Sequence, residues 1–231
     1  TVAQIHINAR IMREFEASWI DTFIRIAHEH REKIGTTTLR HNIARYLEEL
    51  KASVVKIDFE YPFFYEKTTP VTKEKCFVCY NCLYSAKMSS IDDTAKIRQR
   101  IEVPVVTTYP VSTELTKGGL FGQLSKVVLE VETKGDFMPE DLVDLVDKHA
   151  LAPVYSYLSE EDQHHVIEKI HSERKTSVVT VDEIKNELAA NTDVLWYSVR
   201  CQNYGMLHNY STVIGTEKSM WIPSSTDDEE I

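Results

Sequence analysis

Apolar and polar residues alternate near the start of the chain, where Ile5 and Ile7 stand between polar neighbours, and this period of two predicts a strand over residues 2–15. From Trp19 onward the apolar residues recur at intervals of three and four, which predicts a helix that ends at Gly35. The threonines of residues 36–38 can cap a second amphipathic helix. The chain is therefore expected to begin with a strand followed by two helices.

The middle of the chain is rich in valine, isoleucine, tyrosine, phenylalanine and threonine, which favour strands. The predicted strands are 54–65, 76–87, 96–108 and 124–133. Helices return at Pro139, a residue that suits a first helical turn, and again from Thr180 to Leu188. Residues 194–214 are expected to form a final hairpin.

This order of strands and helix pairs occurs about twice along the chain, which predicts two similar halves, residues 1–90 and 91–223. Elements with one apolar face must pack in layers, so we expect an α+β fold with helix pairs on one face of antiparallel sheets. Residues 224–231 are polar and acidic and are expected to be a disordered tail.

The net charge of −10 narrows the choice of partners. Nucleic acids and anionic membrane surfaces need clustered lysine and arginine, so we expect neither, and a small molecule or another protein is favoured. No apolar run approaches the roughly 20 residues of a membrane helix, and the first residues lack the pattern of a signal peptide. These observations favour a cytoplasmic protein.

Cys76, Cys79 and Cys82 have a spacing that also occurs in metal sites. On a strand the middle cysteine points away from the other two, so buried structural thiols are favoured over a shared metal. His164 and His165, close to Asp162, are a second possible cluster, but adjacent histidines on a polar helix start are usually solvated.

Three segments resemble the GTP cyclohydrolase IB family. Residues 62–71 read PFFYEKTTPV, similar to the family's P-F-F-x-x-K-T-x-P-V stretch. Residues 103–108, VPVVTT, resemble the strand that leads into its C-P-C-S-K-E segment, and residues 203–211, NYGMLHNYS, resemble its N-F-E-S-I-H-N-H-S segment. The resemblance covers most of the chain. It implies a tandem tunnelling fold of two β-β-α-α-β-β units, a homodimer or homotetramer whose sheets join into a barrel, and sites at subunit interfaces.

The resemblance also implies a metal held by a cysteine, two histidines and a glutamate, and a second glutamate that anchors the guanine ring. This chain has Tyr109, Phe121, Gln163 and His208 at the metal positions and Val178 at the anchor position. A phenylalanine cannot ligate a metal, and a glutamine offers only a weak neutral oxygen. We therefore expect no metal and no other cofactor. Asp182 or Glu183 could replace the anchor, but Thr180 and Glu183 also fit an ordinary capping box.

Three functions remain open from the sequence. The first is a metal-independent reaction on a planar or heterocyclic small molecule, in which Tyr109, Glu114 or His208 transfers protons. The residues expected to contact this ligand are Lys67, Phe121, Gln123, Gln163 and Val178. The second is a non-catalytic binding or regulatory homologue, and the third is a GTP cyclohydrolase with relocated metal ligands, forming dihydroneopterin triphosphate.

Each proton-transfer or charged candidate also has an ordinary structural explanation. Lys67 could be a solvated lysine on the surface, and Glu114 an exposed carboxylate in a turn. His208 could be a hydrogen-bonded residue of a hairpin.

Overall fold

The computed structural model describes residues 2–11, 19–29, 36–92, 94–111, 119–135 and 137–218. Residues 12–15 of the predicted first strand lie outside these ranges. Gly35, Glu114 and the predicted acidic tail also lie outside them. The strands are β1 (Gln4–Ile11), β2 (Ala52–Thr68), β3 (Lys75–Ser89), β4 (Lys96–Thr108), β5 (Gly122–Thr133), β6 (Ala152–Pro153), β7 (Val194–Tyr204) and β8 (Ser211–Glu217). The helices are α1 (Trp19–Glu29), α2 (Thr36–Glu49), α3 (Pro139–His149), α4 (Glu160–Ser172) and α5 (Ser177–Ala190).

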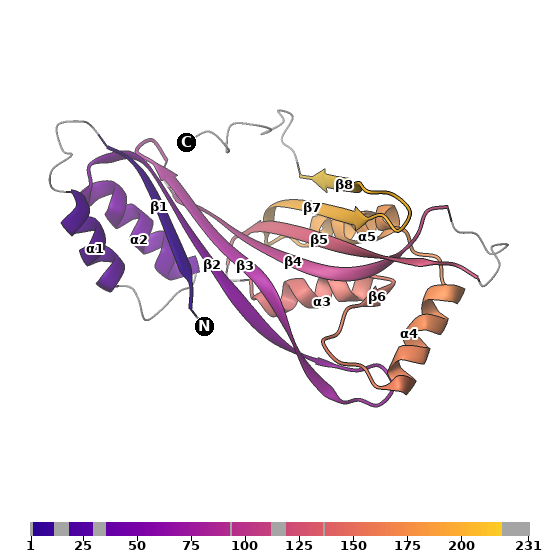
Figure 1. Cartoon of the computed structure of the whole chain (residues 1–231). Coiled ribbons are helices and arrows are strands. Elements are labelled where there is room, and N and C mark those ends of the chain that lie inside the picture. The colour runs from indigo at the N-terminus through magenta and orange to yellow at the C-terminus, as the bar shows by residue number, and fades with distance from the viewer. Residues whose placement is uncertain are drawn as a thin grey trace.

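The strands form one antiparallel sheet in the order β1-β2-β3-β4-β5-β7-β8, and the short β6 pairs with β4. The sheet twists strongly along its length, and β2 and β3 form a long hairpin that reaches past the main sheet toward α4 (Figure 1). These observations confirm the predicted class of an α+β fold with an antiparallel sheet.

The helices pack on one face of the sheet, as the alternation of buried residues shows. Cys82 of β3 and Ile101 of β4 are cross-strand partners and are both fully buried on that face. Two apolar clusters lie there, one between α1, α2 and β1 to β3, and the other between α3, α5 and β3 to β7. Burying a leucine such as Leu142 completely contributes roughly 1.5–3 kcal/mol, so this layering is the main source of stability.

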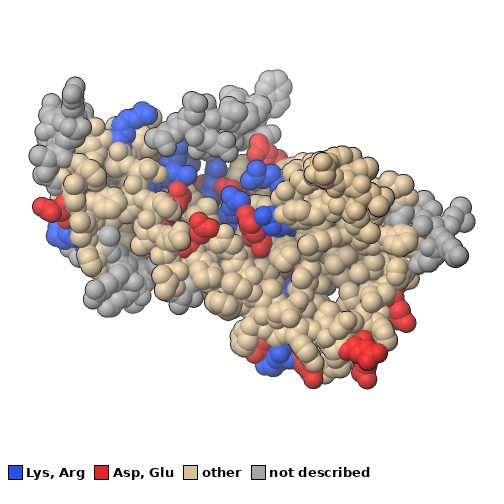
Figure 2. All heavy atoms as spheres, viewed as in Figure 1, with Lys and Arg blue, Asp and Glu red and all other residues tan. Residues whose placement is uncertain are grey.

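No helix of the described residues covers the opposite face of the sheet, and this face carries many charged side chains of both signs. Arg100 and Lys126 both pair with Glu102, at 2.7 and 2.8 Å, and Arg98 stacks 4.0 Å above the ring of Trp196. Figure 2 shows basic and acidic side chains next to each other in the middle of the molecule. We call this the open face.

The second half of the chain has the order β4-β5-α3-α5-β7-β8, with β6 and α4 inserted between its two helices. The described part of the first half has the shorter order β1-α1-α2-β2-β3. The sheet runs without a break from β3 into β4, with Lys87 opposite Lys96. The division of the chain into two similar halves, residues 1–90 and 91–223, therefore stays a prediction.

The sequence prediction is wrong at the start of α5. The helix begins at Ser177, after the cap residue Thr176, so Thr180 lies inside its first turns. Thr180 is fully buried and its Oγ1 has no hydrogen-bond partner among the described residues, so it does not form a capping box with Glu183. In the described part of the chain, no helix is long and apolar enough to cross a membrane.

Candidate functional site

Several predicted residues meet at one end of the sheet, formed by the end of β4, the start of β5, the β7–β8 turn and the start of α5. We call this region the sheet end. The Tyr109 N–H donates to the Phe121 carbonyl at 2.7 Å, which places these two positions next to each other. Asn203 of β7 lies opposite Ser125 of β5, so the turn that carries His208 begins at the same end.

A buried chain of neutral polar side chains lies behind this region. Gln123 Nε2 donates to Thr107 Oγ1 at 3.3 Å, and the Thr107 and Ser125 hydroxyls are 2.8 Å apart. Ser125 donates to Asn203 Oδ1 at 2.8 Å, and Asn203 Nδ2 donates to Ser177 Oγ at 3.0 Å. All five residues are buried. Of these five residues, only Gln123 was predicted from the sequence as a ligand contact. Thr107, Ser125 and Asn203 are polar residues at helix-facing positions of β4, β5 and β7, and this pattern could have identified them as members of a buried hydrogen-bonded chain.

Phe121 forms an aromatic contact at the sheet end. Its half-buried ring meets His171 edge to face, with centroids 6.1 Å apart. The His171 ring Nδ1 lies 2.6 Å from the Leu120 carbonyl, and the Leu120 N–H donates to the His171 carbonyl at 3.1 Å. Gly119 has φ +90°, and a Cβ there would meet His171 O at 3.0 Å, so this close approach requires glycine. No pattern in the sequence predicts this role of His171.

Gln163 is not at the sheet end of the same chain. It is exposed near the start of α4, and its Nε2 donates to the Leu158 carbonyl at 3.0 Å. His171 is eight residues further along this helix, a separation of about 12 Å at 1.5 Å per residue. One chain therefore does not bring the positions of Phe121 and Gln163 together.

His208 and Val178 lie at the sheet end, and both are exposed to solvent. His208 is exposed and stacks on Tyr210 with ring centroids 5.0 Å apart. Val178 is 55% exposed at the start of α5. Both remain able to contact a ligand or a second copy of the chain.

Lys67 is buried and paired, so the structure corrects the alternative of a solvated surface lysine, while a contact of Lys67 with a ligand stays a prediction. Its side chain is 4% exposed and its ammonium lies 2.5 Å from Asp147 Oδ2 of α3. The ammonium also donates to the Val154 carbonyl at 3.4 Å and faces the rings of Tyr80 and Tyr155. Burial raises the pKa of Asp147, and the Lys67 charge opposes this shift.

Asp182 and Glu183 both have local partners, and the replacement of the purine anchor by either of them stays a prediction. Glu183 accepts a hydrogen bond from Lys175 at 2.6 Å and lies 3.1 Å from His149 Nδ1. The Lys175 hydrogen bond is the main cause of the lowered pKa of Glu183. Asp182 is exposed and lies 3.4 Å from Lys185 on the same helix.

Asp162, next to Gln163, has a structural role that no sequence pattern predicts. Its carboxylate is fully buried and accepts hydrogen bonds from Val71 N at 2.7 Å, Thr72 Oγ1 at 2.6 Å and Ser159 Oγ at 2.7 Å. Burial acts to raise the pKa of Asp162, but these hydrogen bonds outweigh it and hold the pKa well below its usual range. Asp162 thus fixes the β2–β3 turn to the start of α4.

The donor set at the positions that the family resemblance implies for the metal does not fit a catalytic transition metal. Tyr109, Phe121, Gln163 and His208 offer one imidazole and no carboxylate or thiolate, and Gln163 lies apart from the others. Within the described ranges no group of three or more histidine, cysteine, aspartate or glutamate side chains could hold a metal.

The cysteines alternate between the two faces of β3 as predicted. Cys76 and Cys82 are buried, but Cys79 is exposed on the other face, so only two of the three are buried thiols. All three are free. His164 and His165 are exposed on α4, as expected for solvated residues.

Comparisons with known structures support the tunnelling fold. The chain superposes on a urate oxidase mutant from Bacillus sp. TB-90 with a TM-score of 0.59 and 9% identity, covering 94% of this chain and 86% of that one. A uricase from Bacillus fastidious gives a TM-score of 0.56 at 8% identity, covering 93% and 81%. At these identities the likeness concerns the fold alone.

Sequence comparisons identify the family. A GTP cyclohydrolase FolE2 from Citrifermentans bemidjiense is 30% identical over 219 residues, which are 95% of this chain and 81% of that protein. A GTP cyclohydrolase FolE2 from Geotalea uraniireducens is 32% identical over 218 residues, 94% of this chain and 79% of that protein. The model of the type I GTP cyclohydrolase FolE2 family matches residues 1–213. Together with the tunnelling fold, this match over nearly the whole chain shows that the chain belongs to the GTP cyclohydrolase FolE2 family, also called GTP cyclohydrolase IB.

Proposed function

We propose that this protein has lost metal-dependent ring opening of GTP and acts on another planar small molecule at the sheet end by metal-independent chemistry. The observation that carries the proposal is the direct contact of Tyr109 and Phe121, at a backbone distance of 2.7 Å, where the family resemblance implies a thiolate and an imidazole. Water activation needs a metal with several fixed ligands, and these side chains do not provide them.

The sheet end has properties that suit a planar ligand. Phe121 and Tyr109 provide aromatic surface, and Gln123 with its neutral hydrogen-bonded neighbours provides donors and acceptors without a formal charge. Tyr109 and His208 are the groups that we expect to transfer a proton there. Val178 stands at the anchor position and adds an apolar contact.

GTP cyclohydrolase activity is the second candidate, and the curated relatives at 30% and 32% identity favour it. It requires metal ligands other than the family's set. A non-catalytic ligand-binding or regulatory role is the remaining alternative.

Purified protein is expected to contain no stoichiometric transition metal and to release no formate from GTP when iron, manganese or zinc is supplied. Elemental analysis and a formate assay measure these quantities. Formate release that His208→Ala abolishes would contradict the proposal and establish relocated ligands. If turnover of GTP is absent, a screen of purines, pterins and other heterocycles by thermal shift identifies ligands, and Tyr109→Phe then separates an enzyme, which loses activity, from a binder.

We further propose a homodimer or homotetramer that forms through open sheet edges. β1 pairs with β2 only as far as Glu60, and β4 pairs with β3 only as far as Asn81. In the described part of the chain, residues 61–68 and 75–80 therefore pair only with each other and leave an open edge on each side. Open edges favour pairing with another chain.

Light scattering at micromolar concentration is expected to give the mass of a dimer or tetramer. Phe64 is 59% exposed and belongs to the segment 61–68 with an open edge. The variant Phe64→Lys should weaken association and so lower the average mass. Ile167→Lys, at a 48% exposed position of α4, serves as a matched control and should not change it. A wild-type monomer would refute this proposal.

A further inference from the structure

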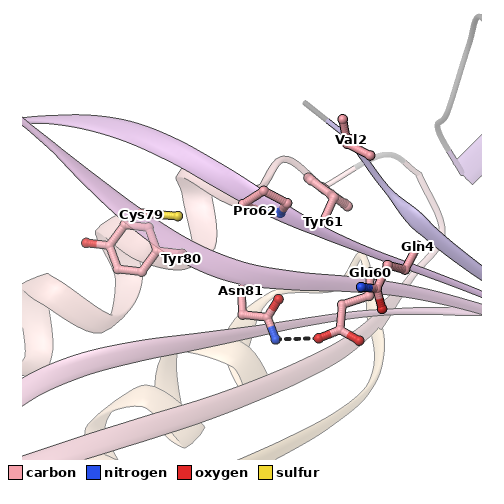
Figure 3. Close-up of a pocket in the computed structure, with 8 residues that line it drawn as sticks. All are labelled: Val2, Gln4, Glu60, Tyr61, Pro62, Cys79, Tyr80 and Asn81. Atoms are coloured by element: carbon pink, nitrogen blue, oxygen red, sulfur yellow. Dashed lines mark hydrogen bonds between the residues drawn. The ribbon is translucent and has the colours of Figure 1, made fainter.

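A hollow of about 360 Å³ lies on the open face, away from the sheet end, where the first residues of the chain meet the middle of β2 and β3. Its polar lining comes from Gln4, Glu60 and Asn81, and its apolar walls come from Val2 and Pro62. Cys79 lies at one side of it (Figure 3). None of the residues discussed for the sheet end lines this hollow.

Glu60 differs from the other acidic residues of the open face. β2, β4 and β5 carry six acidic residues, and five of them have a lysine or arginine partner. The exception is Glu60, for which the described residues provide no basic partner. The five pairs are Asp58 with Lys56, Glu66 with Lys75, Glu102 with Lys126, and both Glu130 and Glu132 with Arg98.

The Glu60 carboxylate is held in a fixed orientation. Asn81 Nδ2 donates to Glu60 Oε1 at 2.7 Å, as the dashed line in Figure 3 shows. This bond occupies one oxygen and leaves the other for a ligand, while Asn81 Oδ1 and the Gln4 amide add acceptors at the same hollow. A half-buried carboxylate without a basic partner in a chain of net charge −10 attracts a cation.

We propose that this hollow binds a small planar cation of the guanidinium or amidinium class. The parallel N–H groups of such a cation match the geometry of a carboxylate with a neighbouring amide oxygen, whereas an ammonium is a point charge without this match. Val2 and Pro62 provide apolar contact for the flat faces of the ligand. This site is independent of the function proposed for the sheet end.

Methylguanidine is the probe, with methylammonium as the charged control and methylurea as the neutral one. Saturation-transfer NMR on the full chain should give a dissociation constant for methylguanidine at least tenfold lower than for either control. Glu60→Gln keeps the shape of the side chain and should weaken binding at least tenfold. Glu66→Gln removes a paired carboxylate from the same strand and face, and should change binding by less than twofold.

Cysteine alkylation provides a second, independent measurement of binding at this hollow. Cys79 is exposed while Cys76, Cys82 and Cys201 are buried, so iodoacetamide should modify Cys79 first. Saturating methylguanidine should slow this modification in the wild type and in Glu66→Gln but not in Glu60→Gln. The proposal is overturned if methylguanidine does not bind, if it binds no better than methylammonium, or if the two variants behave alike.

Discussion

Lys67→Met is expected to lower the free energy of unfolding by about 3–5 kcal/mol, because it leaves Asp147 buried without its charged partner. Asp147 Oδ1 already has no hydrogen-bond partner among the described residues, so the carboxylate depends on Lys67 for compensation. Urea unfolding measured at pH 7 provides the test. The double variant Lys67→Met, Asp147→Leu should recover most of the loss, since it removes both charges from the buried site.

The decrease in the free energy of unfolding caused by Lys67→Met should also depend on pH. Burial raises the folded-state pKa of Asp147, and removing the opposing lysine charge raises this pKa further. An acid with a raised folded-state pKa binds a proton more readily in the folded state, so stability increases as the pH falls through that pKa. The difference between variant and wild type should therefore shrink as the pH falls through the folded-state pKa of Asp147.

Lys75→Met is the matched control for this experiment. Its partner Glu66 lies at the same end of β2, but the side chains are 68% and 41% exposed, so the change should be at most about 1 kcal/mol. Equal losses in Lys67→Met and Lys75→Met would contradict a special role for the buried pair.

Asp162→Ala is expected to lower the ratio of folded to unfolded protein by about two orders of magnitude at pH 7, because the turn and helix donors that it satisfies lose their acceptor. The folded-state pKa of Asp162 is lowered, so its contribution is present above the unfolded pKa of about 3.9 and is lost as the pH falls through the folded value. The difference between wild type and variant should thus be constant near neutral pH and decline below about pH 4. Urea unfolding as a function of pH measures both.

Glu161→Ala changes the neighbouring exposed carboxylate of α4 and should have little effect on stability. If Asp162→Ala is as stable as Glu161→Ala, the hydrogen bonds to Asp162 do not hold the turn against the helix. Because the turn follows the stretch PFFYEKT of β2, its loss should also increase hydrogen exchange in residues 69–74.

The local patterns in the sequence identified most of the sheet and four of the five helices. Alternation on β3 correctly placed Cys76 and Cys82 on one face and Cys79 on the other, because side-chain direction in a strand follows from its backbone alone. The pattern failed for α4, where Asp162 is the only buried residue, so the helix has almost no apolar period to detect.

The sequence also indicated the family through its three motifs, and the same resemblance predicts that Tyr109, Phe121 and Gln163 replace metal ligands and that Val178 replaces the purine anchor. These are properties of side-chain identity and need no coordinates. The partners of charged and polar side chains were not accessible in this way. Lys67 was expected to contact solvent or ligand, but α3 brings Asp147 to it from 80 positions away in the sequence.

What the sequence by itself determined about this protein is its fold class and its family, since period and residue type are local quantities. Only the tertiary structure decided that Asp162 and Lys67 are buried and that Glu183 is paired with Lys175. It also decided that Glu60 has no basic partner among the residues that the structure describes. Burial and pairing depend on which distant segments meet when the sheet twists and the helices pack, because the free energy of a charge is set by its neighbours in space rather than by those in the chain.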